Sequence, residues 1–153
     1  MHTLENKIPP PLVASLIGAA MWLLSFYVPS IAVAEWVRIA LALTITALGT
    51  FFCLSGAVSF RRAKTTVNPL KPETASALVS SGIYQYSRNP MYVGFALFLV
   101  ALAAYLASPV ALLGPLGFVL YINRFQITPE ERALTALFGA EFQAYQARVR
   151  RWL

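Results

Sequence analysis

The sequence has one cysteine, one histidine and few charged residues, and each shortage excludes a class of protein. Cys53 lies inside an apolar run, so neither a disulfide framework nor a thiolate metal site is expected. His2 lies next to the terminus and has no second imidazole with which to build a metal site, so we predict none. None of the eight glycines completes a G-x-G-x-x-G loop, which soluble nucleotide-binding folds use for their cofactors.

Charged residues make up only 12% of the chain, whereas hydrophobic residues make up 58%. This composition is too apolar for an ordinary soluble protein and predicts an integral membrane protein. The alternative is an unusually apolar soluble bundle, but the nearly continuous apolar runs leave its helices without a polar face. The net charge is +6, and the basic residues collect beside the apolar runs. This clustering predicts contact with membrane lipids and no nucleic-acid partner.

Four apolar runs predict an all-α bundle of about four transmembrane helices. The runs cover residues 12–28, 36–60, 90–107 and 110–122. Ser108-Pro109 turns the chain between the last two runs and makes them a helical hairpin. In the fourth run, Gly114, Pro115 and Gly117 predict a kinked helix that packs closely against a neighbour.

The basic residues also predict an orientation. Eleven of the twelve lie in the N-terminal arm, after Phe60 or after Ile122, and Arg38 is the exception. By the positive-inside rule, four crossings with both termini and the active site in the cytoplasm satisfy this distribution, as in a bacterial inner membrane. We expect a single domain over residues 1–153. Residues 1–60 would form the two N-terminal helices, and residues 61–153 a cofactor-binding loop, the hairpin and a C-terminal helix.

The last segment has the pattern of a separate helix with its own start. Thr128 as N-cap, Pro129 next and Glu131 three positions after the threonine form a capping box. Apolar residues then recur at helical spacing as far as Trp152, which predicts an amphipathic cytoplasmic helix. Glu130 and Glu131 fall on or beside its apolar face, where capping alone does not require them.

Polar and aromatic residues gather just before the third run. Asn89 as N-cap, Pro90 at the first helical position and Arg88 beside them predict a site for an anion such as a carboxylate. An ordinary helix start has the same residues, so both interpretations stay open. The tyrosines could pack an adenine or anchor the chain at the membrane interface; they are Tyr84, Tyr86 and Tyr92. Arg124, near membrane depth after the fourth run, is either a site residue or a side chain that reaches to the headgroups.

Several of these motifs occur in a recognisable order. They are Arg88-Asn89-Pro90-Met91-Tyr92, a hairpin, Pro129-Glu130-Glu131, Phe138-Gly139, Tyr145 and Arg150-Arg151-Trp152. This order resembles the isoprenylcysteine carboxyl methyltransferase family and its phospholipid methyltransferase-like relatives, over residues 65–153. The resemblance implies a membrane enzyme that uses S-adenosyl-L-methionine to methylate a lipophilic carboxylate, thiol or amine reached from the bilayer.

The resemblance also implies a site. The cofactor residues it implies are Ser76, Ala77, Leu78, Val79, Tyr84, Asn89, Pro90, Met91, Tyr92 and Glu130. Arg88 and Arg124 are expected to orient the acceptor, with Glu131 as a support or base. The chain departs from the family pattern twice, because Asn89 stands where a histidine is usual and Gln126 where an arginine is common. The second departure puts a prenylcysteine carboxylate acceptor in doubt, and we expect Arg124 to substitute for the missing cation.

Two other functions are compatible with the same residues. One is a non-catalytic membrane scaffold or carrier that keeps the architecture. The other is a reductase-like protein that uses a related helical pocket for a nicotinamide cofactor. Binding of S-adenosylmethionine or of NADPH distinguishes the three, and nothing in the sequence sets the oligomeric state.

Overall fold

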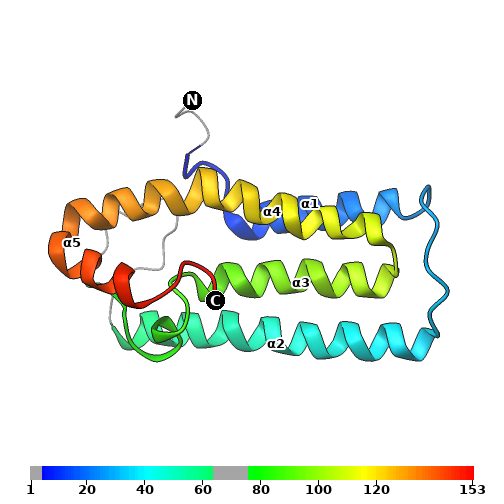
Figure 1. Ribbon diagram of the computed structural model, residues 1–153, viewed down its shortest axis with the longest axis horizontal. Coiled ribbons are helices and arrows are strands. Elements are labelled where there is room, and N and C mark those ends of the chain that lie inside the picture. The colour runs from blue at the N-terminus through cyan, green and yellow to red at the C-terminus, as the bar shows by residue number, and fades with distance from the viewer. Residues whose placement is uncertain (1–4, 64–75) are drawn as a thin grey trace.

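The computed structural model describes residues 5–63 and 76–153, and these residues form helices and no strands. Figure 1 shows four antiparallel helices: α1 (Pro10–Leu24), α2 (Glu35–Arg62), α3 (Pro90–Leu106) and α4 (Leu113–Ile122). α5 (Thr128–Arg148) continues from α4 and extends beyond the end of the bundle. The 3₁₀ turns η2 (Gly82–Gln85) and η3 (Pro109–Leu112) precede α3 and α4. The predicted all-α fold is therefore confirmed.

Two helices in the described residues are long and apolar enough to cross a membrane: α2, with 28 residues, and the continuous helix Pro109–Arg148. Only 6% of the most apolar stretch of α2 is buried inside the protein, so its apolar side chains face outward. Such a surface is suited to lipid. α1 and α3 are apolar but have 15 and 17 residues, less than the usual length of a span. Four crossings therefore remain a prediction.

The apolar runs predicted the first three helices to within a few residues. α1 begins at Pro10, inside the proline lead, because a proline fits the first turn of a helix, where its missing N–H is not needed. α3 begins at Pro90 for the same reason. It ends at Leu106, where Ala107 adopts a left-handed conformation with φ of 48°. The chain then turns at Ser108 into η3 and α4, as the predicted hairpin requires.

The predicted capping box is wrong, because no helix starts at Thr128. Ile127, before it, already has helical angles, and the Thr128 hydroxyl donates to the Asn123 carbonyl at 2.7 Å instead of capping. The π-helical turn η4 (Asn123–Ile127) joins α4 to α5. Pro129 has no N–H to donate to a helical hydrogen bond. It follows directly after the π turn, where the hydrogen-bonding pattern of the helix already changes. The result is a helix that continues from Pro109 through η4 to the interruption at Gly139, which is longer than a single crossing of the hydrocarbon core requires.

α5 also departs from the single regular helix that was predicted. Gly139 has φ of 49° and ψ of −121°, angles that interrupt the helix and reverse its direction. The second half folds back toward the start of α3 and ends at Arg148, and residues 149–153 continue without helix (Figure 1).

Glycines bring the helices into close contact. A Cβ on Gly94 of α3 would collide with the Cys53 sulfur and the Gly49 carbonyl of α2, and one on Gly114 of α4 would collide with Met21 of α1. The predicted close packing of the fourth helix is therefore confirmed at Gly114. It does not hold at Gly117, where a Cβ would meet nothing within 4 Å.

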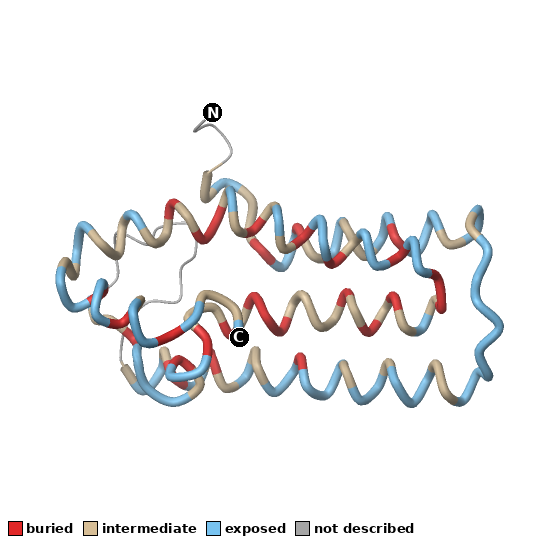
Figure 2. The backbone as a smooth tube through the Cα atoms, in the orientation of Figure 1, coloured by how far each residue is buried: buried red, intermediate tan, exposed pale blue. Residues whose placement is uncertain are grey.

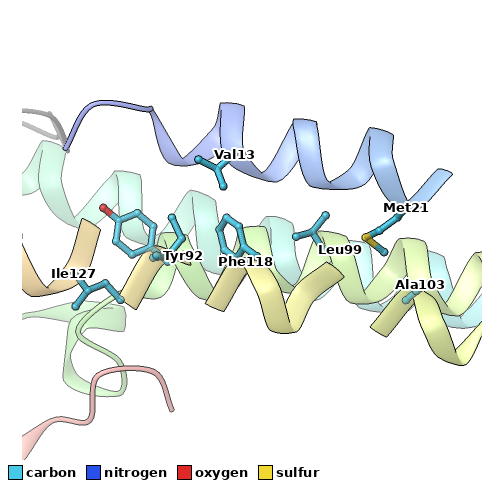
Figure 3. Packing of buried hydrophobic residues seen from close by; sticks show 9 residues of the cluster. Val13, Met21, Tyr92, Leu99, Ala103, Phe118 and Ile127 are labelled. Carbon is cyan, nitrogen blue, oxygen red and sulfur yellow. The ribbon is translucent and has the colours of Figure 1, made fainter. Parts of the chain in front are cut away.

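The main hydrophobic core runs along α1, α3 and α4, and Figure 2 shows buried residues at intervals along these helices. Phe118 and Ile122 at its centre are completely buried. Figure 3 shows Tyr92 at one end of this core, with its ring among the apolar side chains. A second, smaller core lies under α5 and consists of Val79, Tyr84, Phe142, Tyr145 and Val149. The polar residues described next lie where these two cores meet.

Candidate active site

The segment before α3 is held by the C-terminal tail. Asn89 occupies the N-cap position, as predicted, but its side chain makes no cap. Its amide group instead donates to the Arg151 carbonyl at 2.8 Å, and its backbone N–H donates to the buried Ser87 hydroxyl at 3.1 Å. The predicted capping role of Asn89 is therefore wrong. The residue joins α3 to the tail.

Arg88 connects the start of α3 to both halves of α5. Its guanidinium donates to Glu131 Oε1 at 2.7 Å and to the carbonyls of Gln146 and Val149, each at 3.1 Å. Its backbone N–H donates to the Arg150 carbonyl at 3.0 Å. With 12% of its side chain exposed, Arg88 is nearly buried among these acceptors. This arginine closes the turn of α5 at Gly139 by holding its two ends together.

Glu131 lies between two cations. Its second oxygen accepts a bond from Arg151 at 2.6 Å, while Arg88 occupies the first, and 15% of the Glu131 side chain is exposed. Charge-assisted bonds to both oxygens of a largely buried carboxylate are strong and directional. Arginine donors therefore engage both oxygens of Glu131.

Glu130, the neighbouring residue, has a different environment. Its Oε2 accepts a hydrogen bond from the Tyr92 hydroxyl at 3.1 Å, and Tyr92 is also hydrogen-bonded to the side chain of the buried Gln126. The ion pairs between described residues do not include Glu130. The three side chains come from α3, η4 and α5 and form a polar cluster, termed the Tyr92 cluster below, at the end of the main core.

The segment from Ser76 to Val79 lies against the second core. Leu78 and Val79 pack there with Tyr84, whereas Ser76 is exposed and Ala77 half-buried. The Tyr145 hydroxyl donates to the Tyr84 carbonyl at 2.7 Å and fixes η2 against α5. Burial raises the pKa of Tyr84 above its ordinary value, with a further contribution from the negative charge of Glu130. Tyr84 therefore remains a neutral phenol.

Other predicted site residues lie elsewhere. Met91 faces α2, where a Cβ on Gly56 would meet its side chain at 2.7 Å, and Pro90 is buried as the first residue of α3. Tyr86 is 71% exposed. Arg124 is half-exposed and pairs with Glu5 of the N-terminal arm at 3.1 Å. The structure therefore brings together Tyr84, Arg88, Tyr92, Glu130 and Glu131, and it separates Met91 and Arg124 from them.

Two residues of this region were not among the predicted site residues: Gln126, which the sequence marked only as a polar residue near membrane depth, and Arg151, which received no role. Gln126 takes the inward position expected for Arg124, and its spacing of four residues before Glu130 on one helix was the available signal. Arg151 pairs with Glu131 across the fold, and nothing near it in the sequence marks that contact. Trp152 reinforces the tail by donating to the Asn123 side chain at 3.1 Å.

Comparison with known proteins identifies the family. The model of the phospholipid methyltransferase family matches residues 37–141, more than half of the chain. The chain belongs to this family. The match covers nearly all of α2, the segment before α3, the hairpin, η4 and most of α5, so it includes Arg88, Tyr92 and residues 130–131. The C-terminal residues that Arg88 contacts lie beyond it. The predicted family resemblance is confirmed.

Relatives of this chain include proteins described as protein-S-isoprenylcysteine O-methyltransferases. The protein from Schizosaccharomyces pombe is 31% identical over 71% of this chain and 46% of its own length. Methyltransferase B from Arabidopsis thaliana is 29% identical over 70% of this chain and 54% of its own length. An uncharacterized Haemophilus influenzae protein is 44% identical over 41% of this chain and all of its own length. The chain thus spans about half the length of these two enzymes, and no solved structure matches it significantly.

Proposed function

We propose that this protein is an integral membrane methyltransferase that transfers a methyl group from S-adenosyl-L-methionine to a lipophilic acceptor reached from the bilayer. The observation that carries the proposal is the meeting of two distant motifs. Residues 88–92 and 129–131 lie in different helices, and Arg88 contacts Glu131 while Tyr92 contacts Glu130. Both motifs lie inside the region that matches a methyltransferase family.

The arrangement of the helices supports four crossings with both termini in the cytoplasm. The N-terminal arm, the C-terminal end of α2, the start of α3 and α5 all lie at one end of the bundle (Figure 1). Arg61 and Arg62 of α2 and the arginines around the Tyr92 cluster therefore lie at that end, as expected of a cytoplasmic face. α1 and α3 are short for a span, but flanking residues and local thinning of the bilayer accommodate such helices.

The residues at this end fit S-adenosylmethionine by their chemistry. Glu130 is outside the ion pairs between described residues, so its carboxylate is suited to accept hydrogen bonds from ribose hydroxyls. Ser76 and Ala77 are accessible and would line the same side, while Val79 and Tyr84 support them from the second core. The Arg88 Nε atom is buried without a partner, which leaves one donor available. Asn89, Pro90 and Met91 would set the position of the start of α3 beside the cofactor.

When bound, the cofactor supplies an activated methyl group on a sulfonium, so the chain has little bond-making chemistry to perform. Its task is to position the acceptor in line and exclude water. Glu131 is proposed as a support, because arginine donors occupy both its oxygens. Arg88 orients the site through Glu131 and the tail. Arg124 is proposed to meet the acceptor, because its half-exposed pair with Glu5 is weak enough to exchange.

Calorimetric titration of the detergent-purified protein tests the proposal. Saturable heat is expected with S-adenosylmethionine and none with NADPH. Binding of NADPH alone would favour a reductase, and no binding of either would favour a scaffold; each result overturns the proposal. Incubation with membrane lipid extract and the cofactor labelled on its methyl group is then expected to give labelled lipid. The acceptor is identified from the labelled product.

A further inference from the structure

One arginine lies at the other end of the bundle, away from the candidate site. Arg38 is in the first turns of α2, beside the loop between α1 and α2 that closes the right-hand end of Figure 1. It takes part in none of the ion pairs between described residues, and its Nε atom is buried without a hydrogen-bond partner. A guanidinium in an apolar environment is costly unless something supplies the opposite charge.

Aromatic side chains from two other helices hold this arginine in place. The Arg38 guanidinium lies over the Tyr105 ring of α3 at 5.9 Å from its centroid. Trp22 of α1 stacks on Tyr105, with centroids 6.4 Å apart and an angle of 6° between the rings. This stack restrains the guanidinium before any ligand binds, which reduces the entropy lost on binding.

The surroundings indicate a membrane interface. Five aromatic residues at this end are all more than a third exposed: Trp22, Phe26, Tyr27, Trp36 and Tyr105. Figure 2 shows that most of the loop between α1 and α2 is exposed. Exposed tryptophan and tyrosine gather at the headgroup level of bilayers, where phosphate groups are the abundant anions.

We propose that Arg38 binds the phosphate group of a membrane phospholipid, at a site that Tyr105 and Trp22 shape. The proposal rests on the proposed membrane arrangement of the helices but not on methyl transfer. Arginine suits this ligand because its planar group of donors matches phosphate oxygens. The site would anchor the far ends of α1, α2 and α3 to the lipid layer opposite the candidate active site.

Native mass spectrometry of the delipidated protein in detergent, without methyl donor, tests this inference. The probes are dioleoylphosphatidylglycerol and dioleoylglycerol, which differ by the phosphate headgroup. Arg38→Gln is expected to weaken retention of the first phospholipid about tenfold and leave dioleoylglycerol unaffected. The control is Arg148→Gln, at an exposed arginine of α5, and it is expected to change neither.

Equal retention of dioleoylphosphatidylglycerol by the parent protein and Arg38→Gln would overturn the inference. A loss of retention in Arg148→Gln as large as that in Arg38→Gln would also overturn it. Millimolar inorganic phosphate is expected not to displace the phospholipid; full displacement would assign the site to free phosphate instead. Two further variants decide the question if Arg38→Gln does not purify. Arg38→Lys keeps the charge, so retention of dioleoylphosphatidylglycerol is expected to fall only a few-fold. Tyr105→Leu removes the aromatic stack, and retention is expected to fall further. The reverse order would contradict the proposed geometry.

Discussion

The Tyr92 hydroxyl donates to Glu130 Oε2 across 3.1 Å and joins α3 to α5 at the end of the hydrophobic core. The tyrosine ring is buried among residues of α1, α3 and α4 (Figure 3), so core packing fixes the position of its hydroxyl. A polar group that is held by a rigid core needs no rearrangement when a ligand binds. Tyr92 therefore couples the bundle to the candidate site.

This coupling predicts that Tyr92→Phe and Glu130→Gln act on S-adenosylmethionine binding through a shared interaction. Each single change is expected to weaken binding about tenfold, because Tyr92→Phe removes the donor that holds Glu130 and Glu130→Gln replaces the carboxyl group with an amide. The double variant is expected to lose less binding free energy than the sum of the losses in the two single variants. Calorimetry on the four proteins measures the coupling, with Glu141→Gln as a control at an exposed glutamate of the same helix. Fully additive losses would show that the two residues act separately.

The sequence predicted the helices that depend on local pattern and composition. Apolar runs located α1, α2 and α3, and the Ser108-Pro109 turn located the hairpin. The junction of α4 and α5 was mispredicted because Thr128, Pro129 and Glu131 have the composition of a helix start. A π turn inside a continuous helix accommodates the same residues. Local propensity does not distinguish a helix start from such a turn.

The site was predictable only where a family pattern supplied the long-range information. Motif order predicted that Arg88 and Glu131 belong together, and the structure places them in contact. The partnership of Glu131 with Arg151, and the inward direction of Gln126 in place of Arg124, depend on the reversal of α5 and on the π turn. Hydrophobic spacing carries no signal for either feature.

Arg88→Ala is expected to release the C-terminal tail. The change leaves Glu131 with one partner and the carbonyls of Gln146 and Val149 without their donor, at a nearly buried position. Breaking such a pair costs about 3 kcal/mol of unfolding free energy. Thermal unfolding in detergent and limited proteolysis of the tail are the measurements, with the exposed Arg148→Ala as control. A stable, protease-resistant tail in Arg88→Ala would show that Arg88 does not anchor it.

Gly139→Ala and Gly117→Ala form a matched pair, because neither Cβ would meet another atom within 4 Å. They differ in backbone conformation, since Gly139 has φ of 49° and ψ of −121° whereas Gly117 lies inside a regular helix. Gly139→Ala is expected to lower stability by about 2 kcal/mol through strain. Gly117→Ala is expected to be neutral or to stabilise slightly. Similar thermal midpoints for the two variants would contradict the reversal of α5 at Gly139.

Gly94→Ala is expected to separate α2 from α3, because its Cβ would collide with the Cys53 sulfur and the Gly49 carbonyl. Overpacking of this kind costs about 2 kcal/mol, and here part of the obstacle is backbone that cannot rotate away. Gly18→Ala is the control, since its Cβ would lie in ordinary contact with Leu99 at 3.6 Å. Gly94 is half a turn from Tyr92 on α3, so the displacement is also expected to weaken S-adenosylmethionine binding. A lower thermal midpoint with unchanged binding would show that the Tyr92 cluster does not depend on the packing of α2 against α3.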